Sequence, residues 1–234
     1  IDEIIPMIQA MNEAVIRAEV VSEIFKETYI IGHKMALGEI SRESPEAYEA
    51  IFMFVVAMYC LESTQFMPSF GVTFAIADSG IFVPVGKSVQ KIAQDEIEIH
   101  VQAHKITLDY ELKTERGIMA FNKLKPKIKK LIDDIVASEK SWVDYLFQDG
   151  RELIGLDANL LFNYTMFCAK DPITFFGFQD QYDNLPEKNP LGYMREWLNI
   201  DKIQGSPQEE NTGAYLLGAI SNDIGSKKLV FDDL

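Results

Sequence analysis

The sequence predicts an all-α fold in which long helices pack as a bundle. Apolar residues recur at helical spacing over most of the chain, beginning with the segment from Ile4 to Leu37. Cap and turn residues separate one periodic segment from the next. The chain has 234 residues, of which 47% are hydrophobic, and this composition suits a globular protein with a substantial core.

The second expected helix is the most apolar segment of the sequence. Ser44 and Pro45 form a good N-cap and first-turn pair at its start. The helix carries Glu62, and Pro68 should kink or break it because proline lacks a backbone N–H. The turn at residues 78–80, with the sequence Asp-Ser-Gly, marks its end.

Helices and turns alternate through the rest of the chain. The expected elements are a helix from about Gly86 to Leu112, a helix from Pro126 to a stop at Asp149-Gly150, a helix over Asn159–Phe178, a loop over Gln179–Asn189 and a short helix ending near Trp197. The residues after about Asn199 are polar and lack strong periodicity. We therefore expect a helical domain over residues 1–198 and a flexible tail over residues 199–234.

Composition argues against several classes of function. The net charge of −14 and the pI near 4.6 disfavour binding of nucleic acid through a basic surface. Cys60 and Cys168 lie far apart in sequence, so a reduced, cytoplasmic setting is expected. The run from Ala50 to Ala77 is long enough to span a membrane. It contains Glu62 and has no flanking basic cluster, so we expect a buried helix and no membrane contact.

Glu62 is the only charged residue in that apolar run, and it suggests a metal site. A buried carboxylate is normally protonated, paired or bound to a metal. Farther along the chain, Glu96 and His100 lie one helical turn apart. Glu and His suit iron or manganese, and ferritin-like bundles bind such metals through inward-facing Glu and Glu-x-x-His residues. The plainer alternatives are a paired structural Glu62 and a solvated surface pair of Glu96 and His100.

Several motifs resemble those of one enzyme family. Glu62, Phe66, Ser69 and Phe70 match an E-x-x-x-F-x-x-S-F pattern. The Gln-Asp-Glu run before His100, the EKSWVDYLFQDG run and the end of the chain match as well. Over nearly its whole length, the sequence resembles the C-terminal part of the small, radical-generating subunit of class I ribonucleotide reductase.

The resemblance implies roles for particular residues. It implies that Glu62 and Glu96 are metal ligands and that Asp95 belongs to an electron-transfer network. It also implies that Phe66, Phe70 and Ile92 line the apolar pocket around the radical site. In the tail, Glu209 and Tyr215 would relay the radical, and the segment from Lys228 to Leu234 would dock on the large subunit.

The sequence departs from the family pattern in three places. The family His lies three residues after its Glu, whereas residue 99 is Ile and the nearest His is His100. A local π-bulge would absorb the extra residue, and Glu98 and His104 remain alternative ligands. Gln94 replaces an Arg, so one surrounding ion pair should be lost. The first half of the family's site, with an Asp, a Glu-x-x-His and usually a tyrosine, is absent.

These features together predict a component of a ribonucleotide reductase small subunit. The expected metal ligands are Glu62, Glu96 and His100, in a dinuclear iron or manganese site shared with a partner chain. A second polypeptide would supply the missing ligands, small subunits would form a dimer, and a large subunit would hold the substrate. Two alternatives stay open: another ferritin-like di-metal oxidase, and a metal-free helical scaffold.

Overall fold

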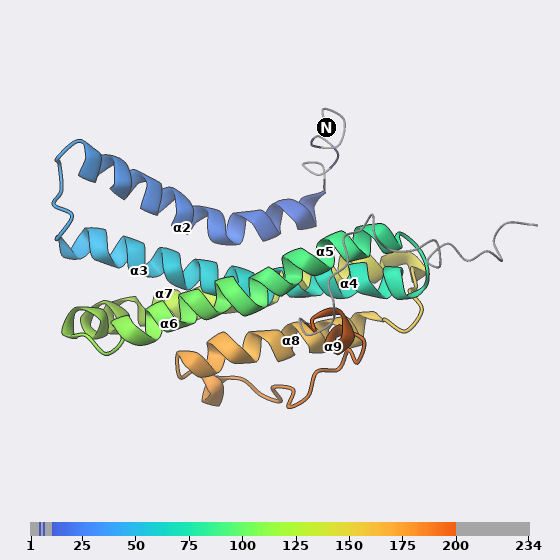
Figure 1. Ribbon diagram of the computed structural model, residues 1–234. Coiled ribbons are helices and arrows are strands. Elements are labelled where there is room, and N and C mark those ends of the chain that lie inside the picture. The colour runs from blue at the N-terminus through green and yellow to red at the C-terminus, as the bar shows by residue number, and fades with distance from the viewer. Residues whose placement is uncertain (1–4, 6, 8–10, 200–234) are drawn as a thin grey trace, which may run out of the picture. The chain divides into compact units, whose positions relative to one another are not determined.

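The structure, a computed structural model, describes Ile5, Met7 and residues 11–199 (Figure 1). In that part of the chain the regular structure is helical, apart from one isolated bridge between Leu153 and Leu156. This confirms the all-α prediction. The α-helices are α2 (Asn12–Ala36), α3 (Pro45–Cys60), α4 (Met67–Asp78), α5 (Val83–Asp95), α6 (Val101–Glu111), α7 (Glu115–Phe147), α8 (Ala158–Phe175) and α9 (Met194–Trp197). Two π-helical turns, η1 (Leu61–Gln65) and η2 (Glu96–His100), and two 3₁₀ turns, η3 (Gln148–Gly150) and η4 (Gln179–Gln181), complete the set.

Most of the expected helices are present, but several boundaries differ. The first expected helix is interrupted, because Met11 has an extended backbone and serves as the N-cap of α2. The α7 helix begins at Glu115 and not after Pro126, which lies inside it. The Thr114 hydroxyl caps α7 by accepting a hydrogen bond from the N–H of Gly117. This cap and the long buried face of α7 outweigh the one backbone hydrogen bond that Pro126 cannot donate.

Helix starts and stops elsewhere follow ordinary capping chemistry. The Ser44 side chain accepts a hydrogen bond from the N–H of Ala47, as expected for the N-cap of α3. The α4 helix ends at Asp78, within the predicted turn, where Gly80 has a positive φ of 84°. The α8 helix runs from Ala158 to Phe175, close to its predicted range.

Two helical rods are each interrupted by a π-helical turn. Figure 1 shows α5 and α6 as one continuous rod, and η2 joins them. In the other rod, η1 joins α3 to α4, and Pro68 follows in the first turn of α4. The π-bulge expected near Glu96 and His100 is therefore confirmed. The two π-helical turns contact one another.

The buried apolar side chains form two clusters. The first gathers residues of α2, α3, α6, α7 and the C-terminal half of α8, and the second gathers residues of α4, α5, α9, the C-terminal part of α7 and the N-terminal half of α8. Two helices, α7 and α8, run from one cluster into the other. Along α7, for example, Ile135 belongs to the first cluster and Val143 to the second.

Apart from Gln94 on α5, the buried polar residues lie where one cluster gives way to the other. We call them the polar layer: Glu62, Thr64, Gln65, Ser138, Glu139 and Thr165. Glu139, for example, lies between Ile135 and Val143 on α7, and Thr165 lies between Tyr164 and Ala169 on α8. The layer therefore crosses the bundle at the level of η1.

The apolar rod from Pro45 to Asp78 belongs to the core of the bundle. By length and composition it could cross a membrane, but 61% of its most apolar window is buried against other parts of the protein. Phe52 and Val56 pack in the first cluster, and Phe74 packs in the second. This is the arrangement expected for a buried core helix.

The last described turn of the chain packs on α4 and α5. The Trp197 ring stacks on Phe74 with centroids 4.7 Å apart, and its indole N–H donates to Asp78. Gln94, at the position where the resemblance implies an Arg, donates from Nε2 to the backbone carbonyls of Trp197 and Asn199. The expected boundary between residues 1–198 and a tail over 199–234 stays a prediction, because residues 200–234 lie outside the described range.

Candidate metal centre

Glu62 lies on η1, in the polar layer between the two apolar clusters. The residue is only 4% exposed. Burial raises the pKa of the Glu62 carboxyl because the charged form loses its hydration. His104 offsets part of this increase in pKa, since it is the nearest residue that can carry a positive charge.

Glu96 and His100 approach Glu62 from η2. His100 Nδ1 lies 3.0 Å from Glu96 Oε2 and 4.0 Å from Glu62 Oε1. Each of the three residues offers one ligand atom, and these atoms all lie within 4.8 Å of one another. The structure therefore brings together the three residues that the sequence singled out as metal ligands.

The π-helical turn explains how the four-residue spacing works. An α-helix completes a turn in 3.6 residues, so a His three or four positions after a Glu lies on the same helix face. A π-helical turn bonds residue i to i+5 and is wider. The turn η2 spans residues 96–100, so it accommodates the extra residue relative to the pattern that the sequence resembles while Glu96 and His100 stay close together.

His104 is a fourth donor beside Glu62. It lies one turn beyond His100, on α6, and its Nε2 atom is 3.0 Å from Glu62 Oε2. Even so, Oε2 of Glu62 is buried without a well-aligned hydrogen bond from any described residue. A buried carboxylate in this state, with one imidazole near each of its oxygens and a second carboxylate close by, fits a cation such as iron or manganese. Glu98, the other alternative ligand, is exposed and is not part of the group.

The other predicted site residues lie around this group in different environments. Phe66 and Phe70 are neighbours, with ring centroids 6.3 Å apart. Ile92 is 51% exposed, and Asp95 is exposed on the same rod. The described residues therefore do not close an apolar pocket around Ile92. Two predicted site residues, Glu209 and Tyr215, lie outside the described range.

The sequence reasoning missed a pair of charged residues in the polar layer. Arg17 on α2 and Glu139 on α7 form an ion pair in which Arg17 Nε donates to Glu139 Oε1 at 2.6 Å. Glu139 is completely buried. A usable signal was present, since Glu139 falls on the apolar stripe of its helix, between Ile135 and Val143.

Comparison with known proteins identifies the family. The family described as "Ribonucleotide reductase, small chain" matches residues 2–190. The chain is 28% identical over 180 residues to the ribonucleoside-diphosphate reductase subunit beta of Buchnera aphidicola subsp. Schizaphis graminum, covering 76% of this chain and 47% of the relative. It is 26% identical over 188 residues to ribonucleoside-diphosphate reductase 1 subunit beta of Escherichia coli O157:H7, covering 79% and 49%. The chain thus spans about half the length of these curated relatives.

A solved structure supports the same fold. The putative class I ribonucleotide reductase from Bacillus halodurans superposes with a TM-score of 0.52 at 20% sequence identity. The match covers 76% of this chain and 60% of that one. The chain belongs to the family of ribonucleotide reductase small chains, and it has the all-α, ferritin-like fold of that family.

Proposed function

We propose that this chain is a component of a ribonucleotide reductase small subunit and supplies part of a dinuclear iron or manganese site. Glu62, Glu96 and His100 would be its ligands. The observation that carries the proposal is the grouping of their ligand atoms within 4.8 Å, with the Glu62 carboxylate buried and its Oε2 atom without a well-aligned hydrogen bond from the described residues. Family membership supports a role in the reduction of ribonucleotides to deoxyribonucleotides.

The residues of this chain would hold the metal site and carry the radical away from it. When bound, the metals would supply the redox chemistry that generates a radical. Phe66 and Phe70 would keep water from the site, and Asp95 would belong to the electron-transfer network beside Glu96. Glu209 and Tyr215 would pass the oxidising equivalent to a large subunit, which holds the substrate.

The site needs further donors to hold two metal ions. In ferritin-like bundles two helices each supply a Glu and the other two each supply a Glu-x-x-His pair. We place the missing Asp, Glu and His on a second polypeptide, within a dimeric, cytoplasmic small subunit. Its docking surface would be the exposed isoleucine stripe of α5, η2 and α6, made of Ile92, Ile99 and Ile106, which are 51%, 57% and 68% exposed. The three isoleucines lie seven residues apart on the rod that carries Glu96 and His100.

The test is metal stoichiometry with and without a second polypeptide. The chain is purified alone and together with the N-terminal half of a ribonucleotide reductase small chain. Iron and manganese are counted by elemental analysis. We expect fewer than two metals per chain alone and two per pair. Ile99→Lys with Ile106→Lys should prevent pairing, whereas Ile154→Lys, at a loop residue 85% exposed, should not. Two metals bound by the chain alone would contradict the shared site.

A further inference from the structure

Buried polar atoms without a hydrogen bond concentrate around η1. In the described part of the chain they are Glu62 Oε2, Gln65 Oε1, Glu139 Oε2 and Trp142 Nε1. The last three belong to residues that surround Arg17, whose guanidinium carbon lies 4.8 Å from the centre of the Trp142 ring. Buried polar groups are satisfied in the great majority of cases, so this concentration needs an explanation.

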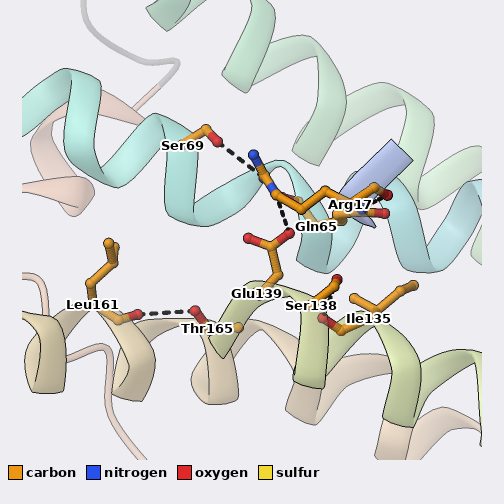
Figure 2. A network of polar contacts seen from close by, with 8 residues as sticks. All are labelled: Arg17, Gln65, Ser69, Ile135, Ser138, Glu139, Leu161 and Thr165. Atoms are coloured by element: carbon orange, nitrogen blue, oxygen red, sulfur yellow. Dashed lines mark hydrogen bonds and ion pairs between the residues drawn. The ribbon is translucent and has the colours of Figure 1, made fainter. Parts of the chain in front are cut away.

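Arg17 connects three elements at the level of the metal centre (Figure 2). Its Nε atom donates to Glu139 on α7 at 2.6 Å. One of its terminal nitrogens donates to the backbone carbonyl of Gln65 at 2.8 Å and to the Ser69 hydroxyl at 3.1 Å. In return, the Gln65 side chain donates to the backbone carbonyl of Arg17 at 2.5 Å. Gln65 is the last residue of η1, so this contact holds the π-helical turn that carries Glu62.

The backbone of η1 needs such a contact. A π-helical turn interrupts the regular hydrogen-bond ladder of its helix. Pro68 follows η1 and has no N–H, so it cannot donate to the carbonyl of Thr64 as an ordinary residue would. The Arg17 guanidinium donates from outside the helix to the adjacent carbonyl, that of Gln65, and its planar fork also reaches Glu139 on α7 and Ser69 on α4.

We propose that Arg17 and Glu139 are positioning residues, which hold η1 so that the Glu62 carboxylate faces Glu96 and His100. Glu139 fixes the guanidinium, and the guanidinium fixes the carbonyl of Gln65. The inference rests on the proposed function, because it concerns a metal ligand. It adds two residues on α2 and α7 that do not touch the metal donors.

Stability is a poor explanation for this network. A buried ion pair with unsatisfied atoms gains little over apolar side chains of similar size, and its apolar replacement is often neutral or stabilising. If the network served only stability, its replacement by apolar side chains should therefore leave both folding and metal binding intact. A network that orients a ligand should be needed for metal binding even where it is not needed for folding.

The test separates these roles with matched variants of the full chain. Arg17→Lys keeps the positive charge but loses the fork, and Ser69→Ala removes one contact of the guanidinium. Arg17→Met with Glu139→Leu replaces the pair by apolar side chains. The control is Lys127→Met, since Lys127 pairs with Glu27 and so also joins α7 to α2, but at an exposed position. Hydrogen exchange of the peptide covering Leu61–Phe66, the thermal midpoint and Co²⁺ affinity are measured for each protein.

We expect faster exchange in η1 and about tenfold weaker Co²⁺ binding in the Arg17 variants, with a thermal midpoint close to that of wild type in the apolar double variant. The Lys127 control should change neither exchange nor affinity. If wild type binds Co²⁺, Arg17 variants with the same exchange in η1 or the same Co²⁺ affinity as wild type would overturn the inference. A wild type that binds no Co²⁺ counts against the proposed function instead. The exchange measurement then still tests whether Arg17 and Glu139 hold η1.

Discussion

His104 Nε2 lies 3.0 Å from Glu62 Oε2, closer than His100 comes to the same carboxylate. His100 and His104 are one turn apart, and Glu96 precedes His100 by the same four residues. The rod of η2 and α6 thus presents three donors in sequence to one buried carboxylate. The pattern that the sequence resembles has one histidine at this point, and His100 and His104 are both candidates for it. Each of them faces a different oxygen of Glu62.

Replacing His104 should reveal whether it takes part in metal binding. We expect His104→Ala to weaken Co²⁺ binding about tenfold, because it removes the nitrogen that faces Oε2 of Glu62. The change should appear in the visible absorption of bound Co²⁺. His33→Ala is the control, since His33 packs edge-on against Tyr29 on α2, away from the site. Equal Co²⁺ affinities of wild type and His104→Ala would show that His104 lies beside the site without binding the metal.

Replacing Glu62 should separate a metal centre from a metal-free scaffold. Glu62→Gln removes a buried charge, so the free energy of unfolding without metal should stay the same or rise by about 1 kcal/mol. Metal affinity should fall by at least about tenfold. Chemical denaturation and Co²⁺ titration measure the two effects. Glu98→Gln, at an exposed position on η2, should alter neither. A wild type that binds no Co²⁺ would favour the scaffold, and a Glu62→Gln variant that binds Co²⁺ as well as wild type would show that Glu62 is not a ligand.

Glu139 should make the stability of the protein depend on pH. Burial raises the pKa of Glu139 from its ordinary 4.5 to about 7, and Arg17 offsets only part of that cost. A carboxyl whose pKa is higher in the folded state contributes stability below pH 4.5, and this contribution is lost as the pH rises through 7. Between pH 4.5 and 7.5 we expect the contribution of Glu139 to the free energy of unfolding to decline by about 3 kcal/mol.

Glu139→Gln should abolish this decline while it keeps the shape of the side chain. The measurement is the free energy of unfolding in urea at several pH values, compared between wild type and Glu139→Gln. The difference between the two curves isolates Glu139 from other titrating groups. Parallel curves from pH 4.5 to 7.5 would contradict the raised pKa.

Gly86 sets how closely α5 approaches α4. A Cβ at this position would lie 2.6 Å from the Ala77 Cβ and 3.3 Å from the Trp197 ring. We therefore expect Gly86→Ala to destabilise the protein by about 1–3 kcal/mol, as overpacking does. Gly32→Ala on α2 is the control, because a Cβ there meets nothing within 4 Å and Ala favours a helix. Thermal unfolding of both variants is the measurement, and equal stabilities would contradict this close packing.

The end of the chain should distinguish a reductase component from a free-standing oxidase. The residues from Lys228 to Leu234 lie outside the described range, and their docking role is a prediction from the sequence. Deleting them should abolish reductase activity of the assembled enzyme but leave metal content unchanged. A di-metal oxidase with another substrate would have no use for this segment, so full reductase activity after deletion would exclude the predicted docking.

The local signals in the sequence were strong where backbone chemistry decides the outcome. Ser44 and Pro45 start α3 as predicted, and the turn after Asp78 ends α4. The predicted start of α7 was wrong, because the proline signal at Pro126 is local and the packing of a 33-residue helix is not. The long apolar run around Glu62 correctly indicated a core helix.

The sequence by itself determined the fold class and which charged residues needed partners, because periodicity and apolar context are local properties. Only the tertiary structure decided which partners they have. It placed His104 beside Glu62 and buried Glu139 against Arg17, two contacts between different helices. It also showed that the polar layer lies where the two apolar clusters meet. These pairings depend on how helices align across the bundle, and no spacing along a single helix specifies that alignment.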